Sequence, residues 1–93
     1  MPPSGIVPPT LSFPKVERRL IITRGIVQGV GFRPFVFRLA THLFLKGYVQ
    51  NNTHGVFIDV EGKGEQLDRF INSMLDSPPP QALIEELHWQ NLP

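Results

Sequence analysis

Cysteine is absent from all 93 residues of the chain, which excludes disulfides, thiolate chemistry and zinc sites built on cysteine. The sequence also lacks any run of about 18 apolar residues, the length that a membrane-spanning helix needs. Neither charge is in large excess, because the formal net charge is +1. A general attraction to nucleic acid or to an anionic membrane is therefore not expected, and any affinity for anions has to be local.

The first 16 residues differ in composition from the rest, because they contain Pro2, Pro3, Pro8, Pro9 and Pro14. This pattern predicts an extended, poorly ordered leader over residues 1–16 and one small domain over residues 17–93. The N-terminus has no basic region followed by an apolar core, so a secretory signal is not predicted. A cytoplasmic location is expected by default.

Strand-like and helix-like patterns alternate along the domain. Apolar residues recur at helical spacing in two segments, and glycine or proline punctuates the chain between the segments. The predicted elements are a strand over 18–24, a loop over 25–31, a helix over 32–46 closed by a left-handed Gly47, a strand over 48–51, a turn over 52–55, a strand over 56–61, a break over 62–64, a helix over 65–76 and a strand over 84–90.

The apolar positions of these elements predict the core. The first helix presents Phe32, Val36, Leu39, Ala40 and Leu43 on one face. The second helix has the clearest periodicity, with Leu67, Phe70, Ile71, Met74 and Leu75. In the last strand, Leu87 and Trp89 are expected to face the core.

The βαββαβ order predicts the fold class. Each βαβ unit crosses over in the right-handed sense, and two interleaved units build an antiparallel sheet with strand order 4-1-3-2. Both helices then lie on one face of the sheet. The sequence therefore predicts an α+β, ferredoxin-like sandwich, a topology that carries many functions and specifies none.

The segment Gly25–Arg33 is the first candidate for chemistry. Three glycines, Gly25, Gly29 and Gly31, lie between the first strand and the first helix. Backbone N–H groups of such a junction can surround an anion, and Arg33 at the helix start adds a bidentate guanidinium. Neither the phosphate-loop pattern nor the dinucleotide fingerprint is matched. A plain turn, in which the glycines only supply unusual φ angles, is the alternative.

Asn51 is the second candidate, because the predicted topology brings the end of its strand to the same end of the sheet as the glycine loop. A neutral carboxamide can hold a water by accepting one hydrogen bond and donating another. Arginine, loop amides and asparagine around one small cavity suit phosphoryl transfer to water, in which positioning and charge stabilisation supply most of the catalysis. No strong general base is evident, so the substrate itself would take the proton.

Two blocks of this sequence resemble the acylphosphatase signature. The first is Gly25-x-Val27-Gln28-Gly29-Val30-x-Phe32-Arg33, and the second is Gly47-Tyr48-Val49-x-Asn51 followed by Gly55. The resemblance implies hydrolysis of acyl phosphates to inorganic phosphate without a metal or cofactor. It implies that Arg33 and the loop amides bind the phosphate and that Asn51 orients the attacking water. The loop residues concerned are Gln28, Gly29, Val30, Gly31 and Phe32.

The segment Gly31–Val36 resembles in more detail the version at the N-terminus of the large hydrogenase maturation carbamoyltransferase. This likeness implies carbamoyl phosphate as a substrate and further domains of a larger enzyme as partners. Tyr48 stands where the family more often has tryptophan, a change that should leave the site intact. The fifth edge strand that usually completes the family's sheet is not evident, so the second strand is expected to be a free edge.

Two other functions remain open. The unit could be a non-catalytic module that binds carbamoyl phosphate or docks within a larger enzyme. The sequence does not separate this module from a hydrolase, since both need Arg33 and the amide cradle. An RNA-binding module is a remote alternative, because Gly31–Phe37 imitates the aromatic signature of RNA recognition modules. That signature belongs on a third strand, whereas here a single strand precedes it.

The remaining polar residues receive simple interpretations. His42, His54 and His88 share no metal-binding spacing, so surface or packed histidines are expected and no metal site is predicted. Asp59 and Glu61 lie on one face of a strand, which predicts a solvent-facing stripe. The arginines of the first strand are interpreted as edge and surface charges: Arg18, Arg19 and Arg24.

Overall fold

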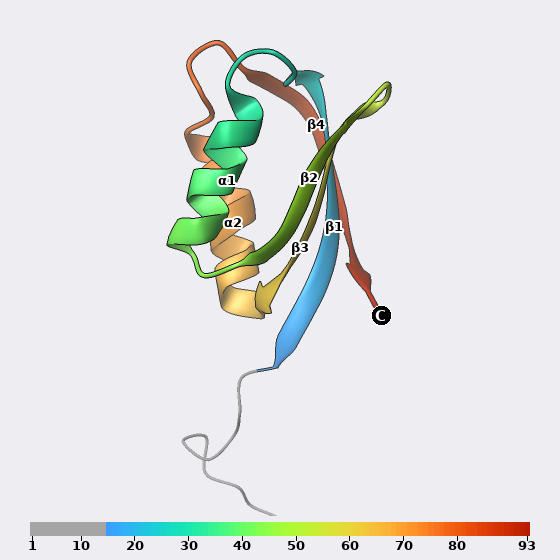
Figure 1. The fold of residues 1–93 in the computed structure, drawn as a ribbon, viewed down its shortest axis with the longest axis vertical. Helices are drawn as coiled ribbons and strands as arrows, with labels where there is room; N and C mark the ends of the chain where they lie inside the picture. Colours follow the sequence, from blue (N-terminus) through green and yellow to red (C-terminus); the bar gives the residue numbers. More distant parts are fainter. Residues whose placement is uncertain (1–14) are drawn as a thin grey trace, which may run out of the picture.

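The computed structural model describes residues 15–93. Figure 1 shows its elements in chain order, which are β1 (Val16–Ile26), α1 (Phe32–His42), β2 (Lys46–Asn52), β3 (Gly55–Lys63), α2 (Gly64–Asp76) and β4 (Leu83–Leu92). Most of the leader predicted over residues 1–16 lies outside the described residues. Its last residue, Val16, was placed there wrongly, because Val16 begins β1 and pairs with Lys63.

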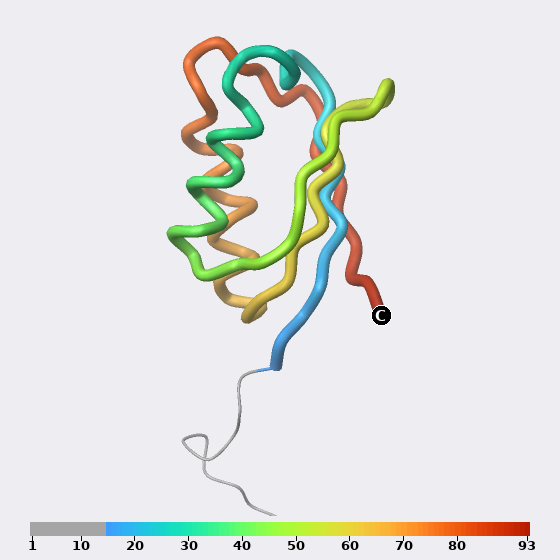
Figure 2. Tube along the Cα trace, viewed as in Figure 1, coloured from blue at the N-terminus to red at the C-terminus, as the bar shows by residue number. Residues whose placement is uncertain are grey.

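The strands form one sheet in the order β2-β3-β1-β4. This is the predicted order 4-1-3-2 counted from the other edge, and both helices cover one face (Figures 1 and 2). The ferredoxin-like fold is therefore confirmed. Because β1 and β2 both pair antiparallel with β3, they run in the same direction and end at the same end of the sheet. Within residues 15–93, β2 pairs with β3 alone and leaves its other edge free.

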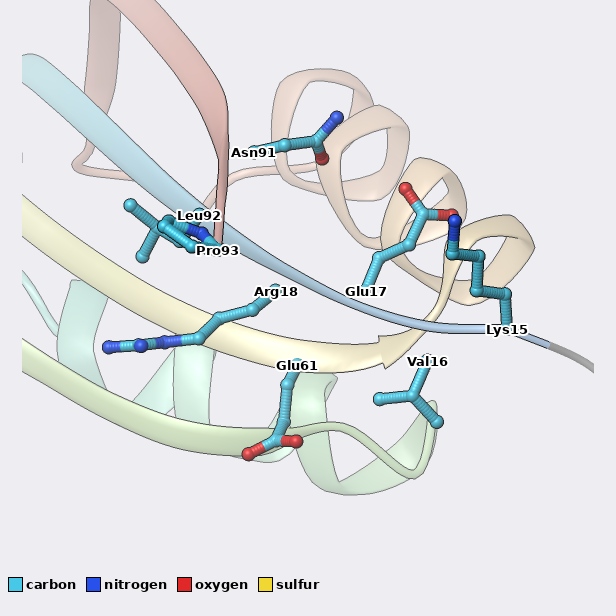
Figure 3. A pocket seen from close by; sticks show the side chains of 8 residues that line it. All are labelled: Lys15, Val16, Glu17, Arg18, Glu61, Asn91, Leu92 and Pro93. Carbon is cyan, nitrogen blue, oxygen red and sulfur yellow. The ribbon is translucent and has the colours of Figure 1, made fainter.

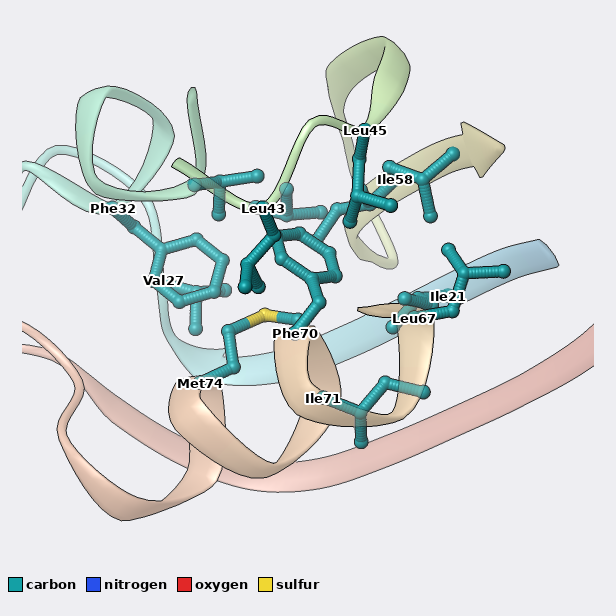
Figure 4. Packing of buried hydrophobic residues seen from close by; sticks show 13 residues of the cluster. Ile21, Val27, Phe32, Leu43, Leu45, Ile58, Leu67, Phe70, Ile71 and Met74 are labelled. Atoms are coloured by element: carbon teal, nitrogen blue, oxygen red, sulfur yellow. The ribbon is translucent and has the colours of Figure 1, made fainter. Parts of the chain in front are cut away.

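The core fills the space between the helices and the sheet (Figure 4). Ile21 of β1 and Ile58 of β3 lie opposite each other in register and are buried. Phe70 and Met74 of α2 pack against them from the helical layer and are fully buried. Each such side chain contributes roughly 1.5–3 kcal/mol by leaving water. The predicted core positions are buried or partly buried with two exceptions, because Leu75 of α2 is 49% exposed and Trp89 of β4 is 45% exposed.

The end of α1 differs from the prediction. The helix ends at His42 and not at Lys46, because Phe44 adopts a left-handed φ of 60°. The N–H of Leu45 then donates to the carbonyl of Ala40 at 2.9 Å, and that of Phe44 to Thr41 at 3.1 Å. These two bonds are those of a Schellman motif, which satisfies the last carbonyls of a helix. A phenylalanine therefore takes the place that Gly47 was expected to fill.

Gly47 instead lies within β2, where the sheet requires it for a different reason. A Cβ atom at this position would overlap the carbonyl oxygen of Asp59 on the neighbouring strand. The predicted break over residues 62–64 is also wrong in part, because β3 continues to Lys63 and Gly62 pairs with Glu17 of β1. Neither position could be assigned from local sequence, since both depend on a neighbouring strand.

The apolar residues of β4 lie on the expected face of the sheet, but Trp89 is more exposed than predicted. Leu87 and Trp89 lie opposite Thr23 and Ile21, which share the helix-facing side of the sheet. Trp89 stays 45% exposed at the sheet edge. The guanidinium of Arg19 lies 4.1 Å from the centre of its ring. None of the helices within residues 15–93 is long and apolar enough to cross a membrane.

Candidate active site

The loop between β1 and α1 is held at both ends by buried side chains. Val27 is 2% exposed and Phe32 is 1% exposed, so each end of the loop is anchored in the core. Between them Gly29 and Gly31 adopt left-handed φ angles of 72° and 78°. Other residues adopt this conformation at a cost of roughly 1–2 kcal/mol, so the two glycines let the backbone curl between its anchors.

A small cavity of ≈ 180 Å³ lies at this loop. It brings together Arg33 from the start of α1 and Asn51 from β2, as the topology predicted. Four of the five predicted loop residues line it as well, but Val30 does not, because its side chain packs against the core. The complete lining is Val27, Gln28, Gly29, Gly31, Phe32, Arg33, Pro34 and Asn51.

The first turn of α1 faces this cavity with unpaired donors. The first helical hydrogen bond runs from the Phe35 N–H to the Gly31 carbonyl at 3.2 Å. The N–H groups of Phe32 and Arg33 precede it and have no helical acceptor, and Pro34 has no N–H. No acidic residue lies in this turn, and Gly31 supplies no side-chain cap. The partial positive charge of the helix terminus is therefore left for an anion.

The two predicted catalytic side chains are both exposed and unengaged. Among residues 15–93, neither the Arg33 guanidinium nor the Asn51 carboxamide takes part in a side-chain hydrogen bond or ion pair. A guanidinium without a carboxylate partner keeps its full capacity to bind a phosphate. An uncommitted carboxamide can hold a water in the same cavity.

Gln28 has a side-chain contact that sequence reasoning missed. Its Nε2 donates to the Asn52 carbonyl at 2.9 Å and lies 3.4 Å from the Gly55 carbonyl. Both acceptors belong to the hairpin between β2 and β3. The partners are 24 and 27 residues away in sequence. No local pattern could have indicated them.

The two largest of the other cavities offer less for an anion. One of ≈ 680 Å³ lies at the opposite end of the sheet, where β1 begins and β3 and β4 end (Figure 3). Glu17 and Glu61 line it beside Lys15 and Arg18, so its charges are mixed. Another of ≈ 590 Å³ adjoins the loop beside Arg24, whose Nε already donates to the His54 carbonyl at 2.9 Å.

The two arginines at the start of β1 are paired. The prediction of surface charges holds for Arg18, whose side chain is 47% exposed, and is wrong for Arg19, which is buried. Arg18 donates to both carboxylate oxygens of Asp59, at 2.9 and 2.7 Å. These hydrogen bonds hold the pKa of Asp59 below its ordinary value, and the nearby positive charge adds to the effect, while burial opposes it. Asp59 is 7% exposed, so the predicted solvent-facing stripe is wrong at this position. Arg19 is 5% exposed and donates to Asp68 at 2.8 Å.

Comparison with solved structures gives the same fold with a related sequence. Full-length HypF, solved in a phosphate- and nucleotide-bound form, matches with a TM-score of 0.84 and 42% identity. The match covers 87% of this chain and 11% of HypF. An acylphosphatase from Coxiella burnetii matches with a TM-score of 0.77 and 29% identity, over 84% of this chain and 82% of that protein.

Sequence comparison gives two kinds of relative. A probable carbamoyltransferase HypF from Methanocaldococcus jannaschii is 51% identical over 72 residues, which are 77% of this chain but 9% of that protein. An acylphosphatase from Thermotoga maritima is 52% identical over 60 residues, which are 63% of this chain and 67% of that protein. The family model described as Acylphosphatase matches residues 19–93, nearly all of the part that the structure describes. The chain therefore belongs to the acylphosphatase family.

Proposed function

We propose that this domain binds the phosphate of an acyl phosphate at the β1–α1 loop and hydrolyses the bond between the acyl oxygen and phosphorus. The observation that carries the proposal is the cavity in which Arg33, the unpaired amides of α1 and Asn51 converge. Carbamoyl phosphate is the substrate we favour, because relatives named carbamoyltransferase match most of this chain. The chain spans 9% of the first of these relatives, so it would act there as one domain among several.

The proposed reaction is an in-line displacement at phosphorus. The Arg33 guanidinium and the N–H groups of Phe32 and Arg33 hold the phosphoryl oxygens, and they stabilise the charge spread over these oxygens in the transition state. The Asn51 carboxamide holds a water on the side opposite the acyl oxygen. The water oxygen forms a bond to phosphorus, and the bond to the acyl oxygen breaks.

The electrons and protons of this step are accounted for without a protein base. The acyl group leaves with the electron pair of the broken bond as a carboxylate, or as carbamate from carbamoyl phosphate. The attacking water passes one proton to a phosphoryl oxygen and keeps the other, so inorganic phosphate is released. A mixed carboxylic–phosphoric anhydride suits this site, because its stable leaving group needs no acid to protonate it.

A turnover assay on acetyl phosphate and carbamoyl phosphate tests this function. Arg33→Met should weaken phosphate binding and lower kcat/KM, whereas Asn51→Ala should lower kcat by about 10²–10³-fold and leave phosphate affinity within about twofold. Arg38→Met is the matched control, because Arg38 is an exposed arginine of the same helix outside the cavity. Equal loss of phosphate affinity in the Arg33 and Asn51 variants would contradict the proposed division of roles.

The second candidate is a module that binds carbamoyl phosphate without hydrolysing it. The small share of the carbamoyltransferase relatives that the chain covers favours it, because chemistry in such a protein can lie in other domains. The same assay separates the two functions. Phosphate-induced shifts of the amides of residues 28–33 without turnover of either substrate would support the binding module. Shifts that cluster away from the loop would contradict both functions.

A further inference from the structure

The side chain of Gln28 connects two segments that each carry part of the cavity. Gln28 belongs to the β1–α1 loop, and its Nε2 donates to the Asn52 carbonyl and lies within reach of the Gly55 carbonyl. Asn52 ends β2 and Gly55 begins β3, and the two residues pair across the two-residue turn between these strands. One carboxamide from the loop therefore closes on the base of the hairpin turn.

This connection matters because Asn51 directly precedes Asn52. The strand β2 lies at the sheet edge and pairs with β3 alone among the described residues, so its end is held from one side. Figure 1 shows the hairpin tip projecting beyond the rest of the sheet, at the end where the loop lies. The ladder with β3 holds this end of β2 from one side, so a bond from the loop adds a second constraint on where Asn51 stands relative to Arg33.

Only one other side chain outside the hairpin bonds its turn within residues 15–93. Arg24 donates from Nε to the His54 carbonyl at 2.9 Å, at the tip of the turn and farther from Asn51. Inside the hairpin, the Asn52 side chain accepts from the His54 N–H at 2.7 Å, which shapes the turn but does not tie it to the loop. The Gln28 bonds are thus the direct link between the phosphate cradle and the strand end that carries Asn51.

We propose that Gln28 is a positioning residue that fixes Asn51 against the β1–α1 loop, so that phosphate and attacking water are held in one geometry. The inference rests on the proposed function. It gives Gln28 two roles, because the residue lines the cavity and its side chain also bonds the hairpin. It also couples the two segments, so an anion in the loop should reduce the motion of the hairpin turn.

The decisive variant is Gln28→Met, which keeps the length and neutrality of the side chain and removes the N–H donors. We expect kcat to fall about fivefold to tenfold, the range that corresponds to one or two hydrogen bonds, with phosphate affinity unchanged within about twofold. Gln50→Met is the matched control. Gln50 is exposed, precedes Asn51 on the same strand and points to the other face of the sheet, so its variant should keep wild-type kcat.

A double-mutant cycle with Asn51→Ala separates positioning from a general structural effect. If Gln28 acts through Asn51, Gln28→Met should cost little further kcat in the Asn51→Ala background. Losses of kcat that multiply in the double variant would overturn the inference. A fall in phosphate affinity of tenfold or more in Gln28→Met would also overturn it, because Gln28 would then be a ligand.

A binding readout keeps this test separate from that of the proposed function. Inorganic phosphate should shift the amide resonances of Thr53 and His54 and slow their hydrogen exchange in the wild type, and should do neither in Gln28→Met. Equal responses of the turn in both proteins would overturn the coupling. If the wild type turns over neither substrate, the proposed hydrolysis fails. If it does but Asn51→Ala leaves turnover unchanged, the role of Asn51 fails and the positioning role of Gln28 fails with it. If Asn51→Ala slows turnover and Gln28→Met does not, the positioning role alone fails.

Discussion

The two ends of β1 place arginines in opposite surroundings. At its beginning, Arg18 is bound by Asp59, and Arg19 is buried between Asp68 and the Trp89 ring. Beyond its other end, Arg33 stands at a cavity with no side-chain partner among the described residues. The difference lies in the neighbours and not in the residue type. Arginine with a carboxylate joins strands and helices, and arginine without one is available to a ligand.

The largest effect is expected when the arginine at the cavity, Arg33, is replaced. Arg33→Met should lower kcat/KM for acetyl phosphate by about 10²–10³-fold, because the developing phosphoryl charge loses its bidentate partner. The free energy of unfolding should stay within about 0.5 kcal/mol of the wild type, since the side chain is exposed and unpaired. Urea denaturation and initial rates on the same preparation measure both quantities.

Arg18→Met is the corresponding variant at the beginning of β1, and it should lower stability and leave kcat/KM unchanged. It leaves the buried Asp59 carboxylate without its two hydrogen bonds, so the urea midpoint should fall while kcat/KM stays near the wild-type value. If Arg18→Met abolished turnover, or if Arg33→Met lowered stability as much as Arg18→Met does, the contrast between the two ends would not hold.

A smaller effect is expected within the buried network of Arg19. Asp68→Asn removes the carboxylate 2.8 Å from a guanidinium that is 6% exposed, which should cost about 1–2 kcal/mol of stability. Arg19→Met should cost less, because it removes the charge together with its need for a partner. The Arg19 Nε is also buried without an acceptor, and methionine removes that deficit. A greater loss in Arg19→Met than in Asp68→Asn would contradict this account.

Phe44→Gly should raise stability by about 0.5–1 kcal/mol. Phe44 is 86% exposed and left-handed, so glycine relieves the backbone cost and loses almost no packing. The residue ends α1 at the far end from the loop, and kcat should therefore not change. A thermal or urea midpoint measures the gain. A lower midpoint would mean that the phenylalanine ring contributes more than its exposure indicates.

The smallest expected effect is a pH dependence of stability from Asp59. Its pKa is lowered in the folded protein by the Arg18 hydrogen bonds. The stabilisation is therefore present above the unfolded value of about 4 and is lost as the pH falls through the lower folded value. Urea midpoints from pH 7 to pH 2 should fall less steeply below pH 4 in Asp59→Asn than in the wild type. Parallel profiles would contradict the assignment.

Several features followed from the sequence alone, for reasons of local chemistry. Helical periodicity located both helices, and Phe70 and Met74 are buried as that periodicity predicted. The βαββαβ order leaves few topologies, so it predicted that Arg33 and Asn51 lie at one end of the sheet, where both line one cavity. The glycines of the loop indicated a left-handed backbone, which Gly29 and Gly31 adopt. The roles of the site residues remain predictions.

Other features were decided only by the tertiary structure, because they depend on partners distant in sequence. Asp59 was predicted to be a surface carboxylate, but it is buried and bonded to Arg18, which is 41 residues away. Gly47 read as a helix cap, but the neighbouring strand requires it, and Phe44 ends the helix in its place. Gln28 was predicted as a phosphate-binding residue of the loop, and no local pattern indicated that its side chain also bonds to the β2–β3 hairpin. Local sequence reports what a residue can do, and the packing of distant strands decides which partner it meets.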